Sequence, residues 1–220
     1  MSDGVSPTAA TGDIVQPATP PRRRSLNPRH LICLAVAAVL AAYQMVPSTD
    51  LAFVPFSLAY IYFLSAFAFP PLRSADNSRV FDLRNRLLGP YISFAAILGL
   101  LLPLLHILDC ASGGDKGGAA AAAPHLFLLC IQVFFEGFTF SRGFSLPMFA
   151  FVPILYNSKR LVTIFWWVAS EFERAEGGRR MVAGRALAVA NSILWAYNLF
   201  GFLLPVYLPR VLKRYYSGSK

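Results

Sequence analysis

The most informative chemical feature of the sequence is an acidic residue inside a long apolar stretch. Glu136 stands in the segment QVFFEG, residues 132–137. An ionised carboxylate at membrane depth is unfavourable and usually faces a cavity, a partner or a transported ion. We therefore interpret Glu136 either as a proton or cation site or as a side chain that pairs locally. The local partners would be Gln132, one helical turn back, or Arg142, if the chain bends at Gly137.

A second set of reactive side chains stands at the end of one apolar run and the start of the next. His106 and Cys110 are four residues apart, so they share a helix face, and His125 follows after a short connection. Imidazole and thiolate are common metal ligands. A metal site built from His106, Cys110 and His125 is one interpretation, and ordinary polar residues at helix ends are the other. We expect the second, with no bound metal or cofactor.

Catalytic signatures do not emerge from the sequence. We find no Ser/His/Asp arrangement, no paired acid and base, and no HExxH motif, so we expect no enzyme. The segment GGDKGG followed by alanines, residues 113–123, lacks the GK[ST] ending of a phosphate-binding loop, and we expect a flexible connection. Cys33, Cys110 and Cys130 show no CxxC spacing, so no disulfide framework is predicted, with a pairing of Cys110 on the non-cytosolic side as the alternative.

Composition indicates the environment in which these residues work. The chain has 220 residues, of which 56% are hydrophobic and 14% charged, against about 25% charged in an average soluble domain. The apolar residues form long runs, which is typical of membrane spans. The net charge of +9 is distributed between the runs rather than gathered in one patch, so we expect no nucleic-acid partner.

The apolar runs predict an all-α, multipass transmembrane helix bundle with about five spans. Residues 30–46 and 51–69 should form a tight helical hairpin around the turn at 47–50, and residues 87–108 a span kinked at Pro103. Residues 124–156 contain Pro147 and Pro153 and predict one crossing followed by an irregular, broken return segment. Residues 186–208 predict the last span.

The region between the last two spans, residues 158–185, has an apolar core of only nine residues, 161–169. Such a segment is too short to cross. We expect a helix lying in the membrane interface with Trp166 and Trp167 at the level of the headgroups. A cytosolic helix packed on the spans is the alternative.

Small and amide residues suggest how the spans pack. The pairs Ala38 and Ala42 in the first span, and Gly184 and Ala188 with Ala186 and Ala190 near the last, are spaced four apart and could allow close helix contact. A generally high alanine content is the alternative. Asn191 and Asn198, seven apart on one face, are expected to hold helices together by hydrogen bonds rather than to bind a substrate.

Lys and Arg residues near the span ends predict orientation, because basic loops are retained in the cytosol. Residues 22–29, 73–86 and 159–185 are basic and should be cytosolic, whereas residues 47–50 and 109–123 should lie on the opposite side. Five crossings then place the basic segment 210–220 on the side that its charge disfavours. We divide the chain into a disordered cytosolic tail, 1–29, a transmembrane domain, 30–209, and a basic C-terminal tail, 210–220.

Four segments carry a resemblance to a land-plant family of multipass membrane proteins with a domain of unknown function. They are residues 122–129, AAPHLFLL, residues 151–160, FVPILYNSKR, residues 184–191, GRALAVAN, and residues 198–209, NLFGFLLPVYLP. The similarity runs from about residue 31 to 216. It implies a plant source and membrane residence, and it transfers no activity and no site residues.

The functional prediction is a non-enzymatic structural or interaction protein of an endomembrane, such as the endoplasmic reticulum. Its cytosolic Lys and Arg loops should attract anionic lipid headgroups, and protein partners are not predicted. The alternative is a small transporter or channel that uses Glu136 at membrane depth. The polar first 29 residues favour a retained first span over a cleaved signal peptide, and a plastid transit peptide is the alternative location signal.

Overall fold

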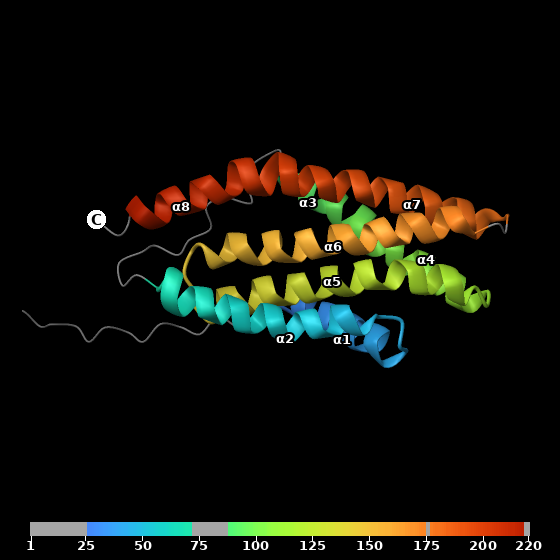
Figure 1. Ribbon diagram of the computed structural model, residues 1–220, viewed down its shortest axis with the longest axis horizontal. Helices are drawn as coiled ribbons and strands as arrows, with labels where there is room; N and C mark the ends of the chain where they lie inside the picture. Colours follow the sequence, from blue (N-terminus) through green and yellow to red (C-terminus); the bar gives the residue numbers. More distant parts are fainter. Residues whose placement is uncertain (1–25, 72–87, 175–176, 218–220) are drawn as a thin grey trace, which may run out of the picture.

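The computed structural model describes residues 26–71, 88–174 and 177–217, and within these ranges the chain is helical without strands. Several helices continue into one another through π-helical turns, so the chain forms six rods (Figure 1). The rods are α1 (Pro28–Ala42), α2 (Ser48–Phe63) with η1 (Leu64–Ala68), α3 (Leu88–Ala96) with η2 (Ile97–Leu101) and α4 (Leu102–Ser112), α5 (Lys116–Ser141), α6 (Met148–Glu173), and α7 (Arg179–Ala196) with η3 (Tyr197–Tyr207) and α8 (Leu208–Ser217). The predicted all-α bundle is confirmed.

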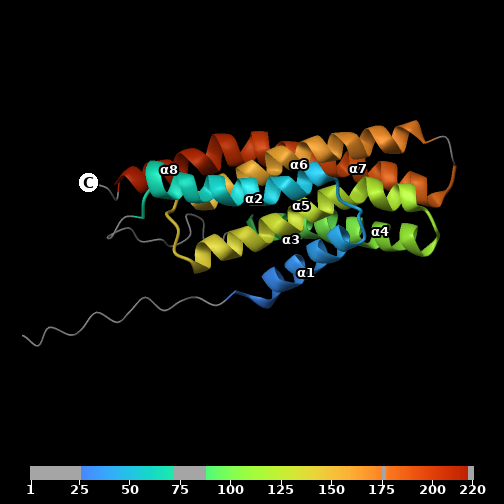
Figure 2. The same ribbon diagram turned by 60° about the horizontal axis from the view of Figure 1, so that its bottom comes forward.

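Successive rods run antiparallel, so the connections gather at two ends of the bundle (Figure 1). One end holds the turn 113–115 and the helix ends that flank residues 175–176. The opposite end holds the turn 142–147, the last residues of α8, and the helix ends that flank residues 72–87. The α1–α2 hairpin opens toward this second end: α2 ends there, whereas the shorter α1 begins nearer the middle of the bundle (Figure 2). α1 packs on α5, and α2 contacts α6.

Three of the helix ends are closed by the same backbone device. After α1, α4 and α5, one residue adopts a left-handed conformation with positive φ: Gln44, Gly114 and Gly143. At each, paired backbone hydrogen bonds satisfy carbonyls of the last turn, as in Phe144 N–H to the Thr139 carbonyl, 3.1 Å, and Gly143 N–H to the Phe140 carbonyl, 3.4 Å. This is the Schellman arrangement, which ends a helix and reverses the chain.

Gly143 explains why the prediction of a broken return segment at residues 124–156 is wrong. The run is divided between two regular helices, α5 and α6, joined by the short turn at Gly143. The prolines do not interrupt it, because Pro147 precedes α6 and Pro153 lies near its start, where few hydrogen bonds are lost. The alanine-rich segment expected to be a flexible connection is the first part of α5.

The interfacial helix expected at residues 158–185 is likewise absent from the described structure. Residues 158–173 continue α6, which packs along its length on α5 and α7. Trp167 is buried in the bundle, 1% exposed, whereas its neighbour Trp166 is 65% exposed on the outside. Packing against two helices thus replaces the interface as the partner of this amphipathic segment.

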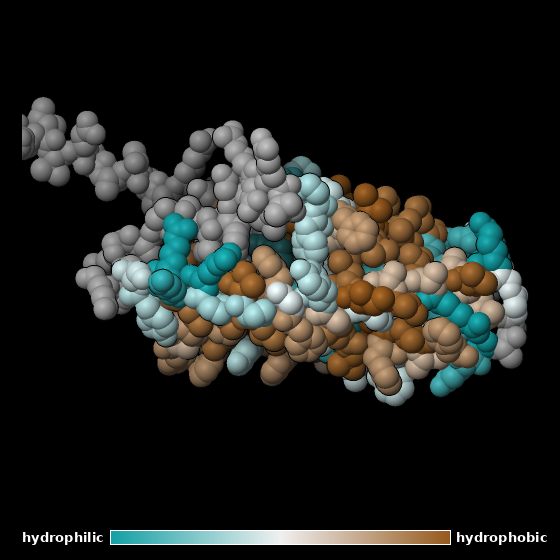
Figure 3. All heavy atoms as spheres, turned by 90° about the horizontal axis from the view of Figure 1, so that it is seen from above, coloured by the Kyte–Doolittle hydropathy of each residue, from teal (hydrophilic) through white to brown (hydrophobic). Residues whose placement is uncertain are grey.

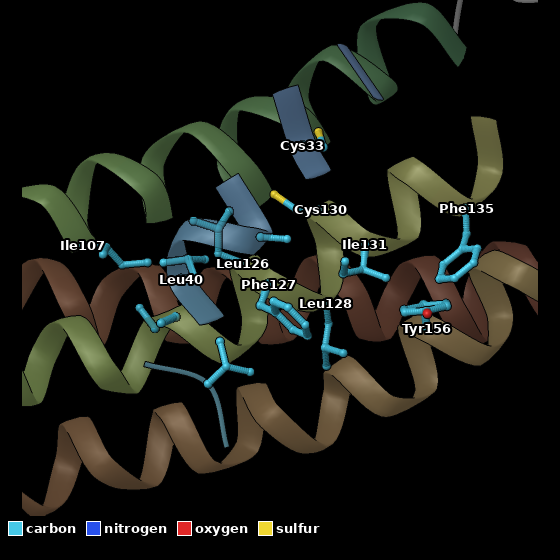
Figure 4. Packing of buried hydrophobic residues seen from close by; sticks show 14 of the residues in the cluster. Cys33, Leu40, Ile107, Leu126, Phe127, Leu128, Cys130, Ile131, Phe135 and Tyr156 are labelled. Atoms are coloured by element: carbon cyan, nitrogen blue, oxygen red, sulfur yellow. The ribbon is translucent and has the colours of Figure 1, made fainter. Parts of the chain in front are cut away.

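The core centres on α5, whose buried side chains contact α1, α4 and α6 (Figure 4). The contact face of α1 is Cys33, Ala37 and Leu40, so the predicted Ala38 and Ala42 stripe is wrong: both residues are exposed. Gly184 and Ala188 are buried as predicted. A Cβ at Gly184 would lie only 2.7 Å from the Glu171 carboxylate, so the close approach of α6 and α7 requires glycine there.

The outer surface of the bundle is suited to lipid. Large apolar side chains such as Phe67, Phe165 and Ile193 are more than half exposed. Figure 3 shows apolar residues over the middle of the visible face and polar residues toward its ends. Within the described ranges, four helical stretches, 48–68, 89–112, 116–141 and 179–217, are long and apolar enough to cross a membrane. These features indicate a membrane-integral protein.

Candidate functional site

In the middle of the bundle, the backbone carbonyl oxygens of Leu98 and Gly99 lack a hydrogen-bond donor within their own helix. In an α-helix, the Gly99 carbonyl would accept a hydrogen bond from the backbone nitrogen of residue 103, four positions on. In the π-helical η2, the Leu98 carbonyl, five positions before residue 103, would accept from the same nitrogen. That nitrogen belongs to Pro103 and carries no hydrogen. Both carbonyls therefore need donors from neighbouring helices.

His125 on α5 supplies one of these donors. Its Nε2 donates to the Gly99 carbonyl at 3.0 Å, and because a carbonyl only accepts, Nε2 carries the hydrogen. The ring is fully buried, stacks on Trp167 with the ring centroids 5.7 Å apart, and leaves Nδ1 with no hydrogen-bond partner among the described residues. The geometry assigns His125 to helix packing, two to three turns inside the bundle rather than at its rim.

Asn191 on α7 supplies the second donor. Its Nδ2 donates to the Leu98 carbonyl at 3.1 Å, and its Oδ1 accepts from Trp195 Nε1 at 3.0 Å. Across the bundle, Asn157 Nδ2 on α6 donates to the Trp195 carbonyl at 3.2 Å. Asn191 thus forms the hydrogen bond between helices that the sequence predicted. Together, Asn157, Asn191 and Trp195 connect η2, α6 and α7.

Arg160 is the cation of this buried layer. It lies midway along α6, is 0% exposed, and its guanidinium carbon is 3.8 Å from the centroid of the Trp195 ring. Nη2 donates to Asn157 Oδ1 at 3.1 Å, while Nε and Nη1 have no hydrogen-bond partner in the described part of the chain. A cation–π contact and an amide oxygen therefore stabilise a guanidinium at mid-depth.

Sequence reasoning missed Arg160, because it lies just before the apolar core 161–169 of the expected interfacial helix and was counted with the basic segment 159–185. A usable signal was present. Arg160 and Glu171 fall on the same face of α6 as the buried apolar residues Tyr156, Ile164 and Trp167. A charged residue at the same helical spacing as a row of apolar residues lies on their face of the helix, which indicates that its charge is buried rather than exposed to solvent.

One end of the bundle, which we call the paired end, comprises residues 109–118 and 171–185. Asp115 caps α5 by accepting from Gly118 N–H at 2.9 Å, and it also accepts from Arg174 Nη2 at 2.7 Å. These bonds, the Arg174 bond above all, lower the pKa of Asp115 below its ordinary value. The same bond raises the pKa of Arg174, so both groups are charged across the physiological range.

Other cations of the paired end are also held. Asp109 Oδ2 lies 3.3 Å from Arg179 Nη2 and 3.2 Å from Arg180 Nε. Arg185 donates to the backbone carbonyls of Glu171, 2.8 Å, and Arg174, 2.9 Å, which are left over at the end of α6. These contacts fasten α4, α6 and α7 to one another.

The opposite end, which we call the basic end, comprises Arg29, residues 142–147 and α8, and residues 1–25, 72–87 and 218–220 are attached to it in the sequence. The sequence assigns this end 13 of the chain's 20 basic residues, with few acidic ones. They are Arg22, Arg23, Arg24, Arg29, Arg73, Arg79, Arg84, Arg86, Arg142, Arg210, Lys213, Arg214 and Lys220. Arg142 is exposed, with its guanidinium 5.5 Å from the Phe138 ring.

Glu136 lies on the exposed side of α5, within its last two turns, and accepts from Gln132 Nε2 at 2.8 Å. The local pairing with Gln132 that the sequence offered is therefore present. Arg142 closes α5 at the edge of the bundle, where it was expected. The ion pairs among the described residues do not join Glu136 to Arg142.

The three weak metal-ligand candidates are only partly brought together. Cys110 Sγ lies 3.6 Å from His106 Nε2 on the same helix face, as the spacing predicted. Both His106 and His125 lie beside Trp167, with ring centroids 6.5 Å and 5.7 Å from its ring. Within the described ranges, no three His, Cys, Asp or Glu side chains are grouped as metal ligands would be.

Comparison with known proteins adds one result. A family model described as a domain of unknown function, DUF7733, matches residues 25–216. No curated protein matches the chain, and no solved structure matches it. The matched segment contains the first five rods and the last rod up to residue 216.

Proposed function

The chain belongs to the DUF7733 family, and for this member we propose a non-enzymatic structural or interaction role in a membrane, exercised through the basic end. In this proposal the basic end faces the cytosol and binds anionic lipid headgroups. Lys and Arg residues close to a membrane surface attract anionic lipids by about 1 kcal/mol each. The same charges orient the protein, because basic segments are retained in the cytosol.

The observation that carries the proposal is the division of charge between the two ends. At the paired end the basic and acidic residues balance, and several are joined in ion pairs. Nearly all of the net charge of +9 therefore belongs to the basic end. The start of α1 faces this end and α8 lies at it, which removes the conflict that five crossings created for residues 210–220. In this proposal an even number of crossings places residues 22–29, 73–86 and 210–220 on one side, and residues 171–185, whose charges balance those of residues 109–118, on the other.

We place the protein in an endomembrane such as the endoplasmic reticulum, with a plastid as the alternative. The support is the resemblance to land-plant membrane proteins. Plant origin rests on the same resemblance.

A transport function receives less support from the geometry. Glu136 is bonded to Gln132 on the outer side of α5, and the interior polar groups His125, Asn157 and Asn191 are bonded to helix backbone. Groups that hold helices together in this way are poorly placed to line a path for an ion. We therefore favour the interaction role.

The test measures binding of phosphatidylserine by the purified full chain in neutral detergent micelles. The triple variant Arg210→Gln, Lys213→Gln, Arg214→Gln removes three charges from α8. At about 1 kcal/mol for each charge, binding should weaken by about 100-fold. A titration with phosphatidylcholine sets the background.

The matched control removes three charges from the paired end, by Lys116→Gln, Arg179→Gln and Arg180→Gln. Phosphatidylserine binding by this variant should stay within a few-fold of the parent. Equal losses in the two variants, or none in the α8 variant, would refute a lipid-binding role for the basic end. Thermal unfolding of both variants checks that the bundle is retained.

A further inference from the structure

The α1–α5 contact brings together two cysteines that are far apart in the sequence. Cys33 lies on the buried face of α1 and Cys130 midway along the buried face of α5. Both side chains belong to the same buried cluster, and Figure 4 shows them close to each other where α1 crosses α5. The spacing in the sequence contained no sign of this pair, because helix packing alone creates it.

The surroundings of the pair favour reaction between the two thiols over reaction with a large molecule. Cys33 is 8% exposed and Cys130 is 1% exposed, and both belong to the apolar core. Charged or bulky reagents cannot reach such a position readily, whereas a small uncharged oxidant can cross an apolar layer. The third cysteine, Cys110, lies next to His106 on α4 and is not part of the pair.

Because the two cysteines lie between α1 and α5, their oxidation state would affect how firmly α1 is held on α5. The rest of α1 meets the bundle through a narrow stripe, Ala37 and Leu40, while Leu31, Ile32 and Val39 are exposed. Cys33 occupies the first turns of α1, which follow directly on the basic end. A covalent bond at Cys33 would therefore fix the start of α1 on α5, where packing alone holds it otherwise.

We propose that Cys33 and Cys130 form an oxidation-sensitive thiol pair that a peroxide converts to a disulfide clamp between α1 and α5. One thiolate attacks the peroxide, the O–O bond breaks, and a sulfenic acid and one water are formed. The second thiol then displaces the sulfenic oxygen, which leaves as a second water. Two thiols and one hydrogen peroxide thus yield one disulfide and two waters, and a dithiol reductant reverses the change.

The experiment treats the purified full chain in lipid nanodiscs with hydrogen peroxide, denatures it, and counts the thiols that react with an alkylating reagent. The parent has three cysteines, so the count should fall from three to one. Peptide mass spectrometry should identify a linkage between Cys33 and Cys130, and a dithiol reductant should restore all three thiols.

Three variants keep the result decisive. Cys110→Ser, the matched control, should still lose two thiols and form the linked peptide. Cys33→Ser and Cys130→Ser should each retain both remaining thiols after the same treatment, with unchanged helical content. Formation of a linkage that includes Cys110, or loss of one thiol at a time to sulfinic acid without a Cys33–Cys130 peptide, would overturn the proposal. Lipid binding by α8 is read separately, so neither outcome depends on the proposed function.

Discussion

The two ends of the bundle use the same residue types for different purposes. At the paired end, Arg174, Arg179 and Arg180 meet acidic partners on other helices. At the basic end, Arg142 closes α5 and lies over an aromatic ring, and α8 carries a row of cations on a strongly amphipathic helix. Arginines that face carboxylates contribute to the tertiary structure, whereas a surplus of positive charge attracts a partner of opposite charge.

The comparison shows why counting Lys and Arg along the chain was misleading at residues 159–185. Orientation rules consider basic residues near span ends. Here Lys159 pairs with Asp50 at 2.6 Å, Arg160 is buried against Trp195, and the arginines that follow balance the acids of the paired end. Much of this basic segment therefore stabilises the bundle.

The largest expected effect concerns the sidedness of the two ends. With a glycosylation acceptor added after Lys220, the protein should remain unmodified in microsomes, because the proposed orientation places the basic end in the cytosol. An acceptor on a polar insertion after Gly114 should be modified. Modification after Lys220 but not after Gly114 would contradict the orientation proposed for the two ends. Modification at both positions would indicate mixed orientation.

The polar layer between the ends should show the next largest effect. His125→Ala removes the donor to the Gly99 carbonyl and leaves a cavity beside Trp167. An unsatisfied buried carbonyl and the lost packing together should lower the free energy of unfolding by about 3 kcal/mol. Thermal unfolding in detergent measures the change.

His106→Ala is the matched control for that variant. His106 is nearly as buried, but its polar contact is the weak one with the Cys110 thiol. Its substitution should therefore destabilise the protein less. A larger loss of stability for His106→Ala than for His125→Ala would contradict the assignment of His125 as donor to the Gly99 carbonyl, which Pro103 leaves without a backbone donor.

A smaller effect should distinguish the paired end by its dependence on pH. Because the folded state lowers the pKa of Asp115, the stability that Asp115 contributes is present above its ordinary pKa of 3.8 and is lost as the pH falls through the lower folded value. Acidification below about pH 4 should therefore open the first turn of α5, as measured by hydrogen exchange.

Asp115→Asn keeps an acceptor for the helix cap but removes the charge that Arg174 meets. It should cost about 1 kcal/mol at neutral pH and flatten the acid response of the first turn of α5. Persistence of the full acid response in this variant would assign it to another carboxylate.

The smallest expected effect is at Glu136. Because Glu136 is exposed and Gln132 donates to it, Glu136→Gln keeps a hydrogen-bonding partner and should change stability by less than about 0.5 kcal/mol. Ion flux into vesicles should be the same for variant and parent. A change in ion flux in this variant would support the transport alternative and indicate an ion path near α5.

Much of the fold follows from the sequence because burial in lipid requires it. The apolar runs predicted the α1–α2 hairpin, the span ending in α4 and the long last rod, since a chain in lipid must pair its backbone groups within helices. The errors fell at α5 and α6. Prolines were given too much weight as helix breakers, and Gly143, which ends α5 through its positive φ, was given too little.

The candidate site was less accessible to prediction. Glu136 and Arg142 were found because an unusual charge in an apolar run is visible in one dimension. Arg160 was missed, because its burial depends on Trp195, a residue 35 positions away that only the contact of α6 with α7 brings to it. The same holds for Cys33 and Cys130.

The sequence by itself determined that the protein is a helical membrane bundle with a large surplus of positive charge. It did so because hydropathy and charge are properties of each residue, independent of its neighbours in space. Only the tertiary structure decided which charges are balanced. Ion pairs, cation–π contacts and the donors to the carbonyls that Pro103 leaves open join residues on different helices, and their distances are set by packing.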